Sequence, residues 1–205
     1  MEKVLVVPND VLQQYIPIEQ FFKHDKELIS NIIQNNYSFM NRDVAEYNYK
    51  FKQIIPYVLV CRSNNYFLLL QRKPKQTEKR LHNKLSLGIG GHINSEVSND
   101  SGNIIIDGLK KELNEEVYLE EPYQLEFIGI LNDNSVDVGK VHLGLVYMIR
   151  TENIFFEVLE KNKMTAKWVN SNELTHCYSQ LESWSQILHD QLISEMRDDI
   201  NNVNG

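Results

Sequence analysis

The sequence predicts a single α+β domain of the sandwich type, in which helices pack against a β-sheet. Three observations favour this class. Apolar runs typical of strands occur before and after one strongly periodic helix, a second periodic helix lies late in the chain, and no repeat or linker divides the 205 residues. A chain of this length can bury about 70% of its unfolded surface, so it needs neither disulfides nor a structural metal to fold.

Residues 1–50 are expected to form an N-terminal extension packed on a core domain of residues 51–205. The β-branched run Lys3–Val7, stopped by a proline, predicts a strand. The stretch 35–50 shows no period and is predicted to be an irregular connection, whose tyrosines could line a pocket or a homodimer contact. Asp25 can cap a helix whose apolar positions share one side: Leu28, Ile29, Ile32 and Ile33.

A hairpin and a glycine-rich turn are expected next. The runs QIIPYVLVCR and YFLLLQR are separated by three polar residues at 63–65 and predict two antiparallel strands. A basic and polar segment, 73–84, leads into LSLGIGGHIN, where three glycines indicate close backbone approach or unusual dihedral angles. Residues 95–103 are polar and predict an exposed insertion.

The most informative stretch, Ile104–Glu120, predicts an amphipathic helix that Pro122 helps to end. At about 100° per residue, Glu112, Glu115 and Glu116 fall on one arc about 100° wide. The helix therefore presents three carboxylates to one place beside its core-facing edge. Its predicted core positions recur at helical spacing: Ile106, Leu109, Leu113 and Val117.

The remainder of the chain predicts more strands and a final helix. YQLEFIGIL, KVHLGLVYMI, IFFEVLE and AKWV are strand candidates, and the second of them shows the clearest alternation of apolar and other residues. Ser179 and Glu182 have the spacing of a capping box. The helix that they would open has these apolar positions on its packed side: Leu181, Trp184, Ile187, Leu188, Leu192 and Met196.

Composition excludes several classes of function. A net charge of −7 argues against binding to large nucleic acids, which normally requires a basic stripe. It does not exclude a nucleotide substrate, because divalent cations can invert the local charge. Cys61 and Cys177 are far apart and are expected to stay reduced, which indicates the cytoplasm. No apolar run approaches the ~20 residues of a membrane span, and the first residues lack the pattern of a signal peptide.

Two interpretations of the acidic helix compete. Mg²⁺ prefers oxygen ligands, so clustered carboxylates that repel one another in isolation become favourable around this ion and a phosphate. The alternative is an ordinary solvated helix face on which Lys110 and Lys111 pair with the glutamates. The double glycine at Gly90 and Gly91 favours the metal site, since a backbone carbonyl can approach an ion closely there.

The motif GG…KELNEEVYL resembles the box of the Nudix (MutT-type) hydrolases. Glu112, Leu113, Glu115, Glu116 and Leu119 fall on matching box positions, Gly91 on the opening glycine, and Lys111 on the box arginine. Two positions depart from the pattern. Asn103 stands where the early box glutamate is expected, after about six extra residues, and Tyr118 replaces the late glycine. Over Val4–Leu174 the chain further resembles a little-characterised branch of predicted Nudix phosphoesterases.

This resemblance implies an α/β/α sandwich with a mixed sheet and an N-terminal extension. It implies hydrolysis of a diphosphate linkage with Mg²⁺ or Mn²⁺, with a nucleoside diphosphate derivative or similar small phosphate compound as substrate. Glu112, Glu115 and Glu116 would be the metal ligands, one of them doubling as base, and the Gly90 carbonyl would complete the set. Many members add a later glutamate, for which Glu157 and Glu160 are the candidates; Glu160 is carried into the expected set.

Four residues near the glycine turn are candidates for binding substrate. Arg72, Arg80 and Lys84 could hold phosphate groups, and His92 could contact substrate or metal-bound water. The alternatives are solvated loop charges and an ordinary turn histidine. His142 is expected to be a sheet histidine with satisfied hydrogen bonds.

Two further functions remain open. One is a Nudix-fold regulatory module that binds a nucleotide without cleaving it, which the two departures from the box would explain. The other is an isomerase of isoprenoid diphosphates, which would need Cys61 to face the pocket.

Overall fold

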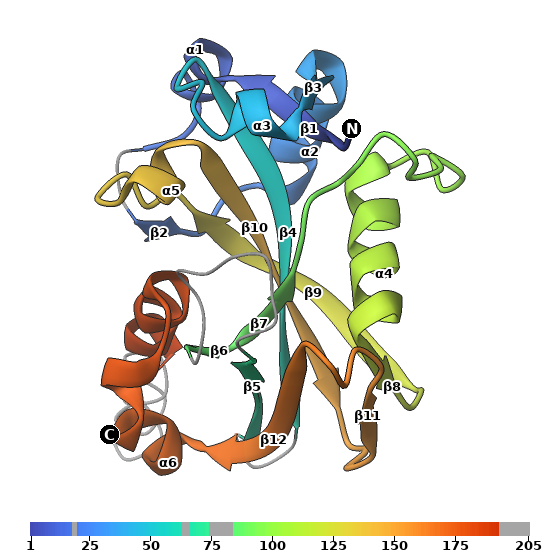
Figure 1. Ribbon diagram of the computed structural model, residues 1–205, viewed down its shortest axis with the longest axis vertical. Helices are drawn as coiled ribbons and strands as arrows, with labels where there is room; N and C mark the ends of the chain where they lie inside the picture. The colour runs from blue at the N-terminus through green and yellow to red at the C-terminus, as the bar shows by residue number, and fades with distance from the viewer. Residues whose placement is uncertain (18–19, 63–65, 74–83, 193–205) are drawn as a thin grey trace.

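The computed structural model describes residues 1–17, 20–62, 66–73 and 84–192, and its central feature is a large mixed sheet (Figure 1). The main strand order is β12-β5-β4-β10-β9-β2, with β1 and β7 also paired to β4. Among the described pairings, β4 with β10 is parallel and the rest are antiparallel. The strands of this sheet are β1 (Lys3–Pro8), β2 (Phe21–Phe22), β3 (Ser38–Asn41), β4 (Phe51–Arg62), β5 (Tyr66–Arg72), β6 (Leu85–Ser86), β7 (Gly88–Gly90), β9 (Tyr123–Leu131), β10 (His142–Thr151) and β12 (Met164–Asn170).

Helices cover both faces of the sheet, which confirms the sandwich. One hydrophobic core joins the sheet to α2 and α4, and a second joins its other face to α6 and the helix over 183–192. In Figure 1, α4 lies on one side of the crossing strands β4 and β7, and α5 and the C-terminal helix lie on the other. The helices are α1 (Asn9–Leu12), α2 (Lys26–Asn36), α3 (Arg42–Ala45), α4 (Ile104–Glu116), α5 (Asp137–Lys140) and α6 (Ser171–His176), with a 3₁₀ turn at Tyr178–Gln180.

The N-terminal segment contributes strands to the same sheet as the rest of the chain. β1 pairs with β4, and β2 pairs with β9 at the far edge. The Asp25 carboxylate accepts from the Leu28 amide, so the predicted cap of α2 is confirmed, although Leu28 itself is exposed. Within 35–50 the expectation of an irregular connection is wrong. That stretch forms β3, whose pairing with β1 satisfies its backbone, and then the short α3.

Helix α4 differs from its prediction in length and in its buried face. It ends at Glu116, and Val117–Leu119 forms strand β8, which pairs with β11 (Phe156–Val158). Pro122 therefore does not end the helix. The helix ends because Val117–Leu119 pairs with β11 as a strand, and Val117 is buried in this strand. Ile106 is only half-buried, and the residues that α4 buries are Ile104, Ile105, Gly108, Leu109 and Leu113.

The last described helix begins later than predicted, at residue 183. Ser179 lies in the 3₁₀ turn and Glu182 is occupied elsewhere: it accepts hydrogen bonds from Tyr57 and Ser86 at 2.8 and 2.6 Å. The predicted capping box is therefore wrong, since its glutamate binds strands β4 and β6 instead.

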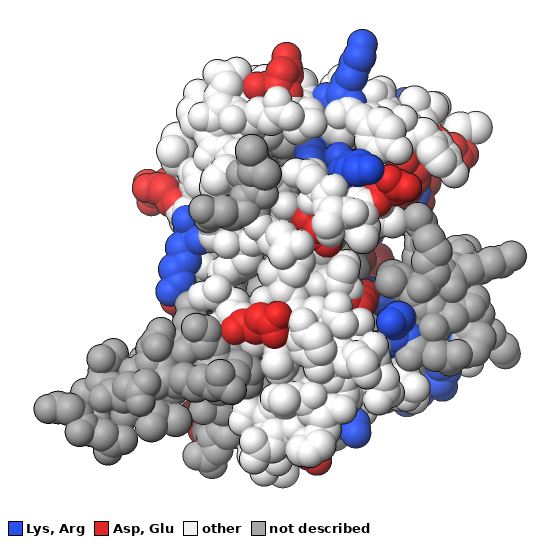
Figure 2. Space-filling model, turned by 90° about the vertical axis from the view of Figure 1, so that its left-hand side faces the viewer, with Lys and Arg blue, Asp and Glu red and all other residues white. Residues whose placement is uncertain are grey.

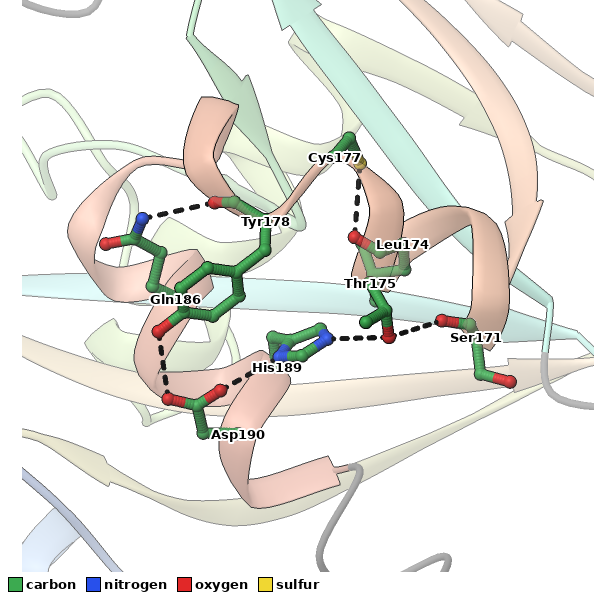
Figure 3. Close-up of polar contacts among 8 residues, drawn as sticks. All are labelled: Ser171, Leu174, Thr175, Cys177, Tyr178, Gln186, His189 and Asp190. Atoms are coloured by element: carbon green, nitrogen blue, oxygen red, sulfur yellow. Dashed lines mark hydrogen bonds and ion pairs between the residues drawn. The ribbon is translucent and has the colours of Figure 1, made fainter.

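Polar contacts attach this helix to α6 (Figure 3). The His189 imidazole lies between the Thr175 hydroxyl, at 3.1 Å, and the Asp190 carboxylate, at 2.9 Å. Tyr178 donates to the second oxygen of Asp190. The Thr175 hydroxyl donates its proton to the Ser171 carbonyl, so it can only accept from His189, and it thereby links the two helices. These contacts attach the later part of the helix to α6 and to the 3₁₀ turn.

Candidate functional site

A cavity of about 690 Å³ lies where the two layers of helices approach the strands β4 and β7. We call it the main cavity. Residues from the N-terminal segment, α3, β4, β7, α4, α5 and the start of the helix at 183–192 line it. Among the described residues, six glutamates line it, and three of these come from α4 and the turn after β11: Glu112, Glu116 and Glu160.

Helix α4 directs two of its three clustered glutamates into the main cavity. Glu112 and Glu116 are four residues apart, so they lie one turn above each other on one face. Glu115 points elsewhere: its side chain is 54% exposed and pairs with Lys111 at 3.7 Å. The structure thus assembles two glutamates of the predicted arc in the cavity and leaves Glu115 outside the lining.

The two glycines before His92 allow a close approach to this helix. A Cβ atom built on Gly91 would lie 2.0 Å from Glu112 Oε2, well inside any permitted contact. On Gly90, which pairs with Tyr57, it would lie 2.8 Å from the Pro56 carbonyl oxygen. Any larger residue at position 91 would displace the Glu112 carboxylate, so the glycine determines where that carboxylate lies.

Burial raises the pKa of both cavity glutamates of α4. The pKa of Glu112 rises to about 7, chiefly through desolvation and then through repulsion from Glu115. Desolvation also raises the pKa of Glu116 to about 7, while Arg72 acts against it and Glu112 and Glu160 add to it. Carboxylates that repel one another in this way are suitable ligands for a hard divalent cation, because the bound cation would relieve the repulsion.

Removing one of these charges is expected to stabilise the metal-free protein. With a folded pKa near 7 and an ordinary value of 4.5, Glu116 contributes stability below about pH 4.5 that is lost as the pH rises through 7. Glu116→Gln has no such titration. In EDTA, we expect the difference in free energy of unfolding between the variant and wild type to be about 1–3 kcal/mol more favourable to the variant at pH 8 than at pH 5.

Urea denaturation at the two pH values measures this difference. Glu120→Gln, an exposed glutamate shortly after the helix, is the matched control and should follow wild type. A Glu116→Gln variant whose stability relative to wild type does not change with pH would contradict the raised pKa.

The structure separates the two candidates for the later glutamate. Glu160 lines the main cavity with a side chain 27% exposed, and it forms an ion pair with Lys163. Glu157 does not line it; its side chain is 47% exposed and pairs with Lys161 at 2.7 Å. Glu160 is thus the one that can join Glu112 and Glu116 around an ion.

Two of the four predicted substrate-binding residues line the main cavity: Arg72 and His92. Lys84 is half-buried and lies outside the lining, and Arg80 falls outside the described residues. The prediction missed Lys163, which lines the cavity after Glu160. Lys163 lies in a short turn between β11 and β12, and the sequence there shows no pattern that would predict a position in the cavity.

A second group of polar residues in the cavity was also missed. Arg42 and Glu46 enter the lining from the segment around α3, which the sequence predicted to be irregular. His142 lines the cavity as well, at the start of β10, where it was predicted to be a plain sheet histidine. Its Nε2 lies 3.2 Å from Nε2 of His92.

The residues that depart from the box have structural roles. Asn103 is the N-cap of α4, and its side-chain oxygen accepts from the amides of Ile105 and Ile106 at 3.1 and 3.3 Å. Tyr118 is exposed in β8 and contacts Phe155 edge to face. Cys61 is buried in the second core and is not among the cavity residues, so it cannot supply the thiol that an isomerase would need.

On the face shown in Figure 2, the Lys and Arg side chains of the described residues are scattered and form no continuous stripe. Within the same described ranges, no helix has both the length and the apolar character to cross a membrane.

Comparison with known proteins identifies relatives that span nearly the whole chain. Protein YmaB of Bacillus subtilis (strain 168) is 34% identical over 201 residues, which cover 93% of this chain and 97% of that protein. The crystal structure of the Nudix hydrolase candidate Tm1382 matches with a TM-score of 0.81 and 31% identity, over 94% of this chain and 99% of Tm1382. No protein-family model matches the chain.

More distant structures share the fold alone. The NUDIX domain of Shewanella oneidensis NrtR, solved with ADP-ribose, matches with a TM-score of 0.57 and 14% identity, over 77% of this chain and 99% of that domain. DR0079 from Deinococcus radiodurans matches with a TM-score of 0.55 and 13% identity, over 76% of this chain and 90% of DR0079.

Proposed function

This chain belongs to the Nudix hydrolase superfamily, whose members hydrolyse phosphate compounds, and we propose that it cleaves a diphosphate linkage with the help of Mg²⁺ or Mn²⁺. The proposed substrate is a nucleoside diphosphate derivative or a similar small phosphate compound. The observation that supports this most directly is the pair of half-buried glutamates, Glu112 and Glu116, which line the main cavity together with Gly90 and Gly91.

The proposed ligands come from three segments. Glu112 and Glu116 on α4 would hold the cation together with Glu160, and the Gly90 carbonyl is a further candidate donor. When bound, the cation would neutralise phosphate charge and make the phosphorus atom more electrophilic toward water. Glu115 would act from the rim, through its charge on Glu112, rather than as a ligand.

The remaining steps use side chains that line the same cavity. Arg72 and Lys163 carry positive charge there and can donate to phosphate oxygens, which orients the linkage to be cleaved. A carboxylate that lines the cavity beside the cation can accept the proton of the attacking water. We propose Glu116 as the group that takes this proton.

A screen in which the hydrolysis products are separated by anion-exchange chromatography tests the proposed reaction, because cleavage of NADH or ADP-ribose gives two phosphate monoesters and no free phosphate. Nucleoside di- and triphosphates, dinucleoside polyphosphates, NADH and ADP-ribose would each be offered with Mg²⁺, with Mn²⁺ and with EDTA. We expect turnover of at least one diphosphate with a metal and none in EDTA. Turnover that EDTA leaves unchanged would exclude the metal-dependent mechanism.

A second candidate function is a module that binds a nucleotide without cleaving it. The observation that favours it is Asn103, which caps α4 where the family box has a glutamate and so provides no carboxylate to the cavity. Calorimetry distinguishes the two. Binding of a nucleotide that persists in EDTA, without turnover of any compound in the screen, would support the binding module.

The two cysteines support our proposal that the protein is cytoplasmic. Cys61 and Cys177 are both free, and burial raises the pKa of each thiol, so neither favours the reactive thiolate. Such thiols suit the reducing environment of the cytoplasm.

A further inference from the structure

Two histidines and a glutamate meet in the main cavity apart from the carboxylates of α4. Nε2 of His92 and Nε2 of His142 are 3.2 Å apart, and Glu46 Oε1 is 4.0 Å from Nε2 of His142. One ligand atom from each residue lies within 4.8 Å of the others. Glu46 directly follows α3, His92 lies after β7, and His142 begins β10, so only the folded chain brings the three residues together.

The backbone fixes which nitrogen of His142 faces this group. Nδ1 lies 2.7 Å from the Val138 carbonyl oxygen, which can only accept, so Nδ1 carries the proton and donates it. In the neutral ring, Nε2 then has its lone pair free and directed toward His92 and Glu46. A backbone carbonyl that holds the far nitrogen of an imidazole is the usual outer contact of a metal-bound histidine.

The distance between the rings suits a shared ion. Two nitrogens bound to one ion at about 2.1 Å lie roughly 3.0–3.4 Å apart in octahedral or tetrahedral geometry. Without an ion, the same 3.2 Å is filled by an N–H···N hydrogen bond from His92 to His142. Binding then requires only that the proton of His92 move from Nε2 to Nδ1, and Glu46 would approach as the third ligand.

A buried amide beside the histidines is an independent sign of a ligand. Gln53 is fully buried, yet within the described parts of the chain neither atom of its side-chain amide has a hydrogen-bond partner. It lies next to His142 in the register of β4 and β10, and it shares a strand face with the cavity residues Ile55 and Tyr57. An unpaired buried amide is costly, and a water molecule bound to an ion nearby would offset this cost by forming hydrogen bonds with it.

The local charges permit a cation although Arg42 stands nearby. Arg42 pairs with Glu2 at 2.9 Å and lies 3.8 Å from Glu46, so two carboxylates share one guanidinium. With both rings neutral, Glu2, Glu46 and Arg42 together carry a net charge of −1. The ammonium of Lys52, which donates to the His142 carbonyl oxygen at 3.3 Å, is held by further oxygens of Asn132, Asn134 and Gly139. Imidazole ligands favour Zn²⁺, Co²⁺ and similar transition metals over Mg²⁺, which favours oxygen.

We propose that Glu46, His92 and His142 form a second metal site, which binds one divalent transition-metal ion such as Zn²⁺. Two histidines and one carboxylate leave positions on the ion open to water or to a ligand. Because these residues line the same cavity as Glu112 and Glu116, the ion would present positive charge to the same phosphate compound. The proposal goes beyond the hydrolase function and does not depend on it, since it concerns binding of the ion alone.

Equilibrium dialysis against Zn²⁺, with Mg²⁺ in large excess to compete for the carboxylates of α4, tests the site on the full chain. We expect wild type to bind one Zn²⁺ per chain, and Glu112→Gln/Glu116→Gln to bind it equally well. His92→Gln and Glu46→Gln should each weaken binding by at least tenfold. His176→Gln, in which an exposed histidine of α6 is replaced, is the matched control and should bind as wild type does.

Co²⁺ absorption spectra supply a readout that a folding defect would not mimic. A Co²⁺ spectrum typical of imidazole ligands in wild type, lost in His92→Gln while circular dichroism shows a folded protein, supports the site. Zinc binding by folded His92→Gln and Glu46→Gln at wild-type strength would overturn it. So would loss of the zinc in Glu112→Gln/Glu116→Gln, because the ion would then belong to the carboxylates of α4.

Discussion

Glu116→Gln is expected to lower kcat/KM by about 10³-fold on any diphosphate that the protein hydrolyses. The amide keeps the shape of the side chain, but it cannot accept a proton from water and is a poor ligand for a hard cation. Both proposed roles of Glu116, as a ligand and as the proton acceptor, are lost together. Steady-state kinetics at saturating Mg²⁺ on the best substrate of the screen measures the loss.

Two controls separate chemistry from folding in that experiment. Glu157→Gln removes an exposed carboxylate that pairs with Lys161 outside the cavity, and it should retain wild-type kcat/KM. Because Glu116→Gln is expected to be at least as stable as wild type, a loss of activity cannot come from unfolding. If Glu116→Gln retains full turnover, the proposed mechanism is wrong.

Gly91→Ala is expected to reduce kcat/KM by about 10²-fold although it removes no functional group. The new methyl would stand 2.0 Å from Glu112 Oε2, so the carboxylate must move by an ångström or more. A displaced ligand misplaces the cation and with it the phosphate. The same variant should need a higher Mg²⁺ concentration for half-maximal activity, which a titration of activity against Mg²⁺ measures.

A double-mutant cycle shows whether Gly91 acts through Glu112. In a Glu112→Gln background, Gly91→Ala should add little further loss, because the carboxylate that it displaces is already gone. Independent, multiplicative losses would show that position 91 acts in another way, for example by shifting β7.

The parts of the fold that sequence predicted correctly are those with a strong local pattern. The α4 helix, the cap at Asp25 and the β4–β5 hairpin each depend on residues close in the chain, and all are present. The cavity position of Glu112 and Glu116 also followed from local spacing, since a helix places residues four apart on one face.

The parts that sequence could not predict depend on contacts between distant segments. Helix α4 ends at Glu116 because Val117–Leu119 pairs with β11, which lies about forty residues later in the chain. Glu115 shares the arc of Glu112 and Glu116, and only the shape of the cavity shows that it points outside. No local pattern contains either fact.

The N-terminal segment is the clearest case of such long-range dependence. Its residues Arg42 and Glu46 line the main cavity because β3 pairs with β1 and β1 with β4. The pattern around them is too short to show a period, so the sequence suggested only an irregular connection. The same pairings bring Glu46 close to His142, which the sequence placed on a strand about a hundred residues away.

Binding of Mn²⁺, followed by the loss of the electron paramagnetic resonance signal of the free ion, tests the central claim most directly. The claim is that Glu112 and Glu116 hold a divalent cation in the main cavity. All proteins would carry His92→Gln, which removes the proposed histidine site, so that the Mn²⁺ counted is held by the carboxylates. In this background we predict that the otherwise unchanged chain and Glu157→Gln bind one or more Mn²⁺ per chain and that Glu112→Gln/Glu116→Gln binds none. Equal Mn²⁺ binding by Glu112→Gln/Glu116→Gln and the otherwise unchanged chain would contradict the claim.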